Sequence, residues 1–306
     1  MANRTIRKLK RHISRGSVCL LLATTGAIAQ PTAGVTLAPF KDKFFAYQKV
    51  LGGNADGSYL DVEYDEFRDV NGRDEMPVRR AHSWFVDTSV RWHEVQKTVA
   101  LEGRRIDIDQ TGTLDGAKFV VIFLHGRGGD RSLGSDDWTF GGNFNRIKNL
   151  AWRNKGAYIA PTVKSYGADG AADIAALIGH AAAAAPNAPI VLACGSMGSY
   201  VCWKLTENKA IAPHLAGMII LGGPSDPDFM GSAAYAAGMP LLLSQGTKDE
   251  AYSWQKQKAV FEAIRQKNPA YPVRFVLFQN GKHGTPIRMI DWRTALNWVF
   301  AESASR

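Results

Sequence analysis

The stretch Pro189-Ile-Val-Leu-Ala-Cys-Gly-Ser-Met-Gly-Ser-Tyr-Val-Cys-Trp-Lys-Leu205 contains an apolar run, a tight turn and a helix-compatible segment in direct succession. The apolar residues predict a buried strand, and the small residues after them predict a sharp corner. Ser196 lies at the apex, as in the strand–turn–helix arrangement that exposes a nucleophilic serine. Gly198 fills the second small position of the Gly-x-Ser-x-Gly pattern, whereas Cys194 stands where the first glycine is usual. An ordinary strand-to-helix turn would have a similar sequence, so the rest of the chain decides between the two interpretations.

Apolar runs of strand length recur along the chain, separated by helix-compatible segments. In residues 118–124 an uninterrupted apolar run follows Lys118, which is typical of a strand buried on both faces of a parallel sheet. Before them, residues 92–101 and 104–109 alternate polar and apolar side chains, which predicts an antiparallel hairpin. This order predicts an α/β fold with one mostly parallel, doubly wound sheet. The other predicted strands are residues 157–160, 190–193, 215–221, 240–244 and 273–278, and the predicted helices are residues 171–184, 253–266 and 289–301.

The first 29 residues differ from the rest of the chain. They carry six basic and no acidic residues, followed by an apolar run that ends in the small-residue pattern Ala27-Ile-Ala29. This predicts a secretory signal peptide over residues 1–29 and export to the periplasm or the extracellular space, with an uncleaved N-terminal anchor as the alternative. The apolar run is shorter than the roughly 20 residues that a membrane span needs, so no stable membrane insertion is expected after cleavage.

Residues 61–80 are rich in acidic and basic residues and have few apolar positions. Residues 30–91 therefore predict an extension that packs on a main domain formed by residues 92–306, in preference to a separate binding domain. Residues 40–51 are compatible with a short helix within that extension. Without the six basic residues of the leader, 31 Lys and Arg face 28 Asp and Glu, so the net charge falls from +9 to +3. A chain so nearly balanced has no electrostatic footprint for nucleic acid.

Two cysteines, Cys194 and Cys202, follow the leader. One ends the predicted strand before the turn, and the other lies nearly two turns along the next helix. At 1.5 Å per residue the second cysteine is about 9 Å along the helix axis from the turn, so no disulfide is expected.

Polar residues follow several predicted strands, at the edge of the sheet where α/β proteins place their functional groups. His125-Gly-Arg-Gly-Gly-Asp130 follows the first buried strand, and its glycines allow backbone N–H groups to point into the crevice. His125 itself is expected to brace that turn. Asp249 follows the strand over residues 240–244, and His283 lies in a Gly-flanked loop after the last strand. Alternatives to Asp249 as the acid are Glu250, Asp226 and Asp228.

The chain order of Ser196, Asp249 and His283 resembles that of the α/β-hydrolase superfamily. The Leu-His-Gly-x-Gly turn at residues 124–128 is most similar to compact serine esterases of the phospholipase/carboxylesterase kind. The resemblance implies a serine carboxylic-ester (or thioester) hydrolase that acts through an acyl-enzyme on Ser196. It also implies an oxyanion hole formed by the N–H groups of Arg127 and Met197. Two alternatives stay open: a peptidase or acyltransferase with the same triad, and a non-catalytic binding protein on a hydrolase scaffold.

The loop over residues 136–146 carries three aromatic side chains among polar amides and could line the substrate site. The insertion over residues 222–239 is too short for a large helical lid, which favours an accessible cleft for a small-molecule ester. No motif for a metal, a phosphate or a dinucleotide is present, so no cofactor is expected. The candidate substrate-binding residues are Gly126, Trp138, Phe140 and Asn143.

Overall fold

The computed structural model describes residues 34–306. The predicted signal peptide lies outside these residues. None of the helices in the described part of the chain is both long and apolar enough to cross a membrane.

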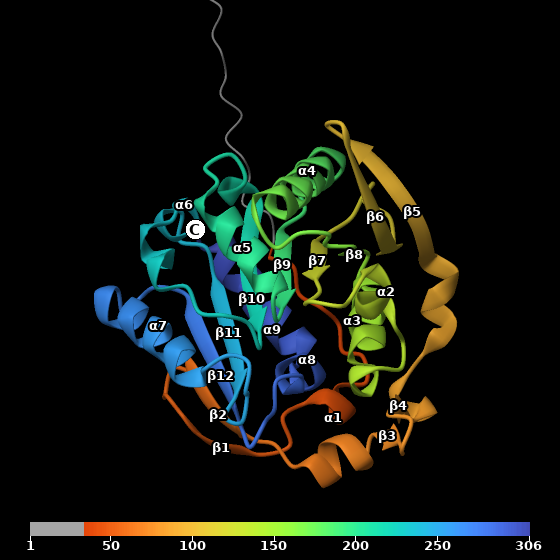
Figure 1. Ribbon diagram of the computed structural model, residues 1–306, viewed down its shortest axis with the longest axis vertical. Coiled ribbons are helices and arrows are strands. Elements are labelled where there is room, and N and C mark those ends of the chain that lie inside the picture. Colours follow the sequence, from red (N-terminus) through yellow and green to blue (C-terminus); the bar gives the residue numbers. More distant parts are fainter. Residues whose placement is uncertain (1–33) are drawn as a thin grey trace, which may run out of the picture. The chain divides into compact units, whose positions relative to one another are not determined.

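One large sheet organises the described residues (Figure 1). Its ten strands lie in the order β1-β2-β12-β11-β10-β9-β7-β8-β6-β5, and the run from β2 to β8 is parallel throughout. The strands at both edges of the sheet pair antiparallel. At one edge β1 pairs with β2, and at the other β8 pairs with β6, which in turn pairs with β5. The strands of this sheet are β1 Val50–Gly53, β2 Tyr59–Glu63, β5 Glu94–Leu101, β6 Arg104–Thr111, β7 Val120–Leu124, β8 Ala157–Pro161, β9 Ile190–Gly195, β10 Leu215–Leu221, β11 Leu241–Gly246 and β12 Val273–Gln279.

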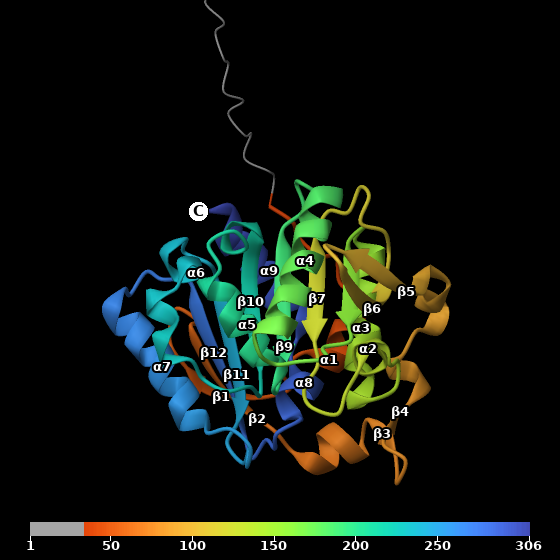
Figure 2. The same ribbon diagram turned by 45° about the horizontal axis from the view of Figure 1, so that its top comes forward.

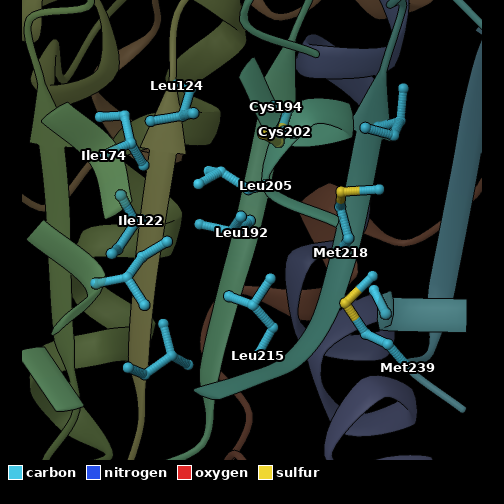
Figure 3. Close-up of a cluster of buried hydrophobic side chains, with 14 of the residues drawn as sticks. Ile122, Leu124, Ile174, Leu192, Cys194, Cys202, Leu205, Leu215, Met218 and Met239 are labelled. Carbon is cyan, nitrogen blue, oxygen red and sulfur yellow. A yellow bond between two sulfur atoms is a disulfide. The ribbon is translucent and has the colours of Figure 1, made fainter. Parts of the chain in front are cut away.

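Helices cover both faces of the sheet, as Figures 1 and 2 show. Side chains of β7 alternate between the two faces: Ile122 and Leu124 pack beneath α4 and α5, whereas Val121 and Phe123 pack against α3 and α9. Figure 3 shows part of the first of these cores. The double burial explains the uninterrupted apolar run, because each apolar side chain removed from water contributes about 1.5–3 kcal/mol. The helices are α1 Asp42–Phe45, α2 Arg131–Ser135, α3 Asn143–Arg153, α4 Ala168–Ala184, α5 Gly198–Glu207, α6 Ala233–Ala236, α7 Trp254–Lys267, α8 Thr285–Met289 and α9 Trp292–Ala304.

The predicted α/β class, the mostly parallel sheet and the hairpin of β5 and β6 are confirmed. Residues 34–91 add to the main sheet, since β2 pairs in parallel with β12. The helix predicted over residues 40–51 is wrong in extent: α1 spans only four residues, and Val50 already belongs to β1. A further small sheet joins β3 (Asp74–Glu75) to β4 (Arg80–Ala81).

The prediction that Cys194 and Cys202 are unpaired is wrong. The two cysteines form a disulfide with a Cα–Cα distance of 6.5 Å, within the usual range for such bonds, and both are fully buried. An estimate from the rise along the axis of α5 gives too large a distance between the two cysteines, because the chain reverses direction at Ser196. Helix α5 runs back beside β9, so its second turn returns toward the strand end that carries Cys194.

Candidate active site

Three side chains from three strand ends form one hydrogen-bonded chain. His283 Nε2 lies 2.9 Å from Ser196 Oγ, and His283 Nδ1 lies 2.9 Å from Asp249 Oδ2. The serine follows β9, the aspartate follows β11 and the histidine follows β12, so the parallel sheet brings together residues far apart in sequence. The Asp249 side chain has no exposed surface, whereas the His283 side chain is 39% exposed. The histidine therefore faces the solvent side of the site and the acid lies behind it.

Ser196 occupies a tight turn that depends on small neighbours. Its φ is 50°, in the left-handed region that non-glycine residues seldom adopt, and its N–H donates to Leu221 O at 3.1 Å. A Cβ atom on Gly198 would lie 2.5 Å from Leu124 O. Glycine at this position therefore allows α5 to start directly against the end of β7. This close packing holds the serine hydroxyl at the surface of the turn.

Asp249 is held by contacts to both carboxylate oxygens. Gln245 Nε2 donates to Oδ2 at 2.7 Å, and the backbone N–H groups of Ala251 and Tyr252 donate to Oδ1 at 2.8 and 3.1 Å. These donors hold the carboxylate in place beside the imidazole. Sequence reasoning did not find Gln245, although a polar residue within the buried strand β11 is a signal that it has a hydrogen-bonding role.

The alternative acids lie elsewhere. Glu250 and Asp228 are exposed, and Asp226 accepts from Asp228 N at 3.0 Å at the start of a short 3₁₀ helix. Among the four acidic candidates, Asp249 is the one that contacts His283 within the described residues.

The turn after β7 approaches the serine closely. A Cβ atom on Gly126 would lie 2.7 Å from Ser196 Cβ and 3.0 Å from Oγ. Across residues 34–306, no protein acceptor binds the backbone N–H of Arg127 or of Met197. Met197 N–H also lies at the N-terminus of α5, where the helix dipole favours negative charge. Both amides are therefore available for an oxyanion.

His125 braces this turn, as expected. Its Nε2 accepts the Val163 N–H at 2.9 Å, so its Nδ1–H donates to Gly126 O at 2.8 Å. Burial lowers the pKa of His125, and the neutral ring can therefore accept at one nitrogen while it donates at the other.

The residues predicted to bind substrate separate into two groups. Gly126 contacts Ser196, and Phe140 lies beside the histidine loop, where a Cβ on Gly284 would be 3.2 Å from its ring. Trp138 instead packs in a side cluster, with the Arg80 guanidinium 3.8 Å from its ring centroid.

Asn143 does not face the substrate site. It is fully buried, and its amide donates to Ile287 O at 2.8 Å and to Ile290 O at 3.0 Å. The loop expected over residues 136–146 contains the first residues of helix α3. The Asn143 side chain thus holds α3 to α8.

Two tyrosines that the sequence did not indicate form part of the rim. The Tyr252 ring centroid lies 5.7 Å from that of His283, and the Tyr200 ring packs edge-on against Tyr252 at 6.4 Å. Burial and the neighbouring Tyr200 hydroxyl raise the pKa of Tyr252 to about 12, so its phenol is neutral across the physiological pH range.

The family model described as "Alpha/beta hydrolase family" matches residues 121–303, which include Ser196, Asp249 and His283. The chain belongs to the alpha/beta hydrolase family. No curated protein sequence matches it.

Solved structures similar to this α/β hydrolase include two esterases. A thermostable esterase is 17% identical, with 70% of this chain and 64% of that chain covered at a TM-score of 0.54. An esterase of Pyrococcus furiosus is 15% identical, with 70% and 93% covered at a TM-score of 0.52. A protein of unknown function from Agrobacterium tumefaciens is 12% identical, with 69% and 94% covered at a TM-score of 0.50. The chain thus spans less than two thirds of the thermostable esterase, and at these identities the likeness shows the fold alone.

Residues 34–306 contain no group of three or more His, Cys, Asp or Glu positioned to hold a metal ion.

Proposed function

We propose that this α/β hydrolase is a serine esterase that cleaves carboxylic esters or thioesters through an acyl-enzyme on Ser196. The observation that carries the proposal is the hydrogen-bonded chain from Asp249 through His283 to Ser196 Oγ, next to two amides without a protein acceptor. This is the arrangement that nucleophilic catalysis by a serine requires.

The reaction follows from the geometry of these groups. His283 Nε2 takes the proton of the Ser196 hydroxyl while Oγ attacks the carbonyl carbon. Asp249 keeps the imidazole in the tautomer that presents Nε2 to the serine and stabilises the imidazolium that forms. The N–H groups of Arg127 and Met197 bind the oxyanion, and each such donor is worth about 2.7–4 kcal/mol of barrier.

The tetrahedral intermediate then expels the alcohol or thiol, which takes the proton from His283. A water molecule, deprotonated by the same imidazole, attacks the acyl-enzyme and releases the acid. The exposed imidazole supports hydrolysis because water can reach it. The short connection between β10 and β11, residues 222–240, supports an open site for small esters.

Activity-based labelling tests the nucleophile directly. A fluorophosphonate probe should label the wild-type protein and should not label Ser196→Ala. Hydrolysis of 4-nitrophenyl butyrate should fall by about 10⁴- to 10⁶-fold in Ser196→Ala and His283→Ala. Faster cleavage of the matching butyryl 4-nitroanilide than of the ester by the wild-type protein would refute the assignment as an esterase.

We also propose that the protein is exported, with residues 1–29 removed. The basic and apolar leader supports this, and so does the disulfide between Cys194 and Cys202, because disulfides persist mainly in oxidising compartments. The N-terminal sequence of the protein recovered from bacteria that express the full chain should begin at Gln30. A leader retained on a protein recovered from the cytoplasm would contradict export.

A further inference from the structure

A cavity of about 160 Å³ lies beside the loop that carries His283. Lys282 and Gly284, on either side of the histidine, both line it. Residues of the segment 34–91 also line it, including Tyr64 directly after β2. Because β2 runs parallel to β12, the chain after each strand emerges at the same edge of the sheet as the catalytic groups.

The charges around this cavity do not balance. Lys282 Nζ is paired with Glu66 at 2.8 Å, and Arg288 is paired with the buried Asp74 at 2.7 Å. Arg79 also lines the cavity, and within residues 34–306 it has no ion-pair or hydrogen-bond partner. The wall therefore carries one positive charge without a counter-ion.

Arg79 is also held in an unusual backbone conformation. Its φ is 53°, in the left-handed region that only a small minority of non-glycine residues adopt. Glu102, in the turn between β5 and β6, has a similar φ of 51°, so the conformation is one that hairpin turns in this chain adopt. At Arg79 it belongs to the turn between β3 and β4, which places the guanidinium on the cavity wall.

We propose that this cavity is a subsite for the leaving group of an ester whose alcohol portion carries a small carboxylate, with Arg79 as its counter-ion. The inference rests on the proposed esterase function. His283 returns its proton to the oxygen of the departing alcohol, so the alcohol lies on the histidine side of the site. The residues on either side of that histidine line the cavity. A cavity of 150 Å³ can hold a benzene ring, so this volume suits one ring or a short chain with its charged end at Arg79.

The test compares two acetyl esters that differ in charge and hardly in shape, 4-acetoxybenzoate and 4-acetoxybenzamide. The ratio of their kcat/KM values is measured for the wild type and for two replacements, Arg79→Gln and Arg79→Asn. Asparagine tolerates the left-handed conformation, so the second replacement separates loss of charge from strain in the turn. The intrinsic reactivity of the two esters cancels when each ratio is divided by that of the wild type.

Both Arg79 variants should lower the benzoate-to-benzamide ratio about tenfold, mainly by raising KM for the benzoate, because a contact remote from the reacting bond acts on ground state and transition state alike. Lys209→Gln is the matched control. Lys209 is an exposed lysine between α5 and β10, at the opposite edge of the sheet, and its loss should leave the ratio unchanged. Added salt should lower the wild-type ratio and should have little effect on the Arg79 variants.

The possible outcomes distinguish failure of the subsite proposal from failure of the esterase proposal. An unchanged ratio in both Arg79 variants would overturn the subsite, and hydrolysis of both esters that depends on Ser196 would still support the esterase. Failure to hydrolyse either ester, together with no fluorophosphonate labelling, would overturn both proposals.

Discussion

Gly126→Ala tests whether the turn after β7 packs so closely against Ser196 that only glycine fits at position 126. The added Cβ would lie 2.7 Å from Ser196 Cβ and 3.0 Å from Oγ. Ser196 Cβ is bonded to the backbone and cannot rotate away, so the turn itself must move. A normal contact between such atoms begins near 3.5 Å, which implies a shift of roughly 0.5–1 Å.

A shift of that size acts on catalysis more than on folding. The neighbouring N–H of Arg127 would leave its position relative to the oxyanion, and the loss of one such donor costs about 2.7–4 kcal/mol, or 10²- to 10³-fold in kcat. Overpacking a fitted site typically destabilises a protein by about 1–3 kcal/mol. We therefore expect kcat for 4-nitrophenyl butyrate to fall by at least about 10²-fold and the unfolding midpoint to fall by a few degrees.

A mutant cycle with Ser196→Gly isolates the contact. That replacement removes both atoms that the new Cβ would meet, so Gly126→Ala should cost almost no stability in its background, as measured by urea unfolding. Gly179→Ala in α4 is the control, because a Cβ there meets nothing within 4 Å. Wild-type kcat in Gly126→Ala, or equal destabilisation in both backgrounds, would refute the close approach.

Three further predictions concern the structure around the triad. The double variant Cys194→Ala/Cys202→Ala should lose about 2.5 kcal/mol of unfolding free energy, because the disulfide closes a loop across a separation of 8 residues and so lowers the entropy of the unfolded chain. Its melting temperature in calorimetry should fall by about 5–10 °C, and a loss below about 1 kcal/mol would contradict this prediction. Gln245→Leu should lower kcat by about 10- to 100-fold with little change in KM, because the acid of the triad loses a donor, and equal changes in both constants would argue against a positioning role. Burial alone would raise the pKa of Asp137, but the Lys148 ammonium at 2.7 Å and neighbouring donors hold this pKa below its usual range. The pair therefore stabilises the fold above about pH 4, and its contribution is lost as the pH falls through the folded pKa. Asp137→Asn should cost about 2–3 kcal/mol of unfolding free energy at pH 7 and clearly less at pH 3, as measured by urea unfolding.

The sheet could be predicted from the sequence because its central strands are buried on both faces. Residues 119–124 and 215–221 carry no polar side chain for that reason. Once the strands are placed, the polar residues directly after them must meet at one edge. The positions of Ser196, Asp249 and His283 followed from this topology, and the structure brings their side chains into contact.

Helix α3 was missed in the sequence because five of its nine buried residues are polar, so that amides and charges interrupt its apolar face. The Asn145 amide donates to Asp137, and the Lys148 ammonium forms ion pairs with both Asp137 and Glu94. A run of amides and charges with internal partners has the composition of a loop. The apolar residues Phe144, Ile147 and Ala151 nevertheless recur at helical spacing and were the local signal for this helix.

The structure of residues 34–91 was difficult to predict from the sequence for a related reason. Strand β2 joins the sheet through backbone pairing with β12, which needs no particular side chains. Another contact of this segment is an ion pair from Asp42 to Arg146, a residue more than a hundred positions away. Neither kind of contact has a periodicity, so the extension is visible only in the folded chain.

The departure of Cys194 from the glycine pattern has a structural reason that the motif alone concealed. The position two residues before the serine faces the helix that follows it, and glycine is usual there because that helix packs closely. In this chain the side chain at that position is bonded to Cys202 on the same helix, with 6.5 Å between the Cα atoms. A covalent bond thus holds strand and helix together on either side of Ser196, and the residue that weakened the match to the motif is one that supports its geometry.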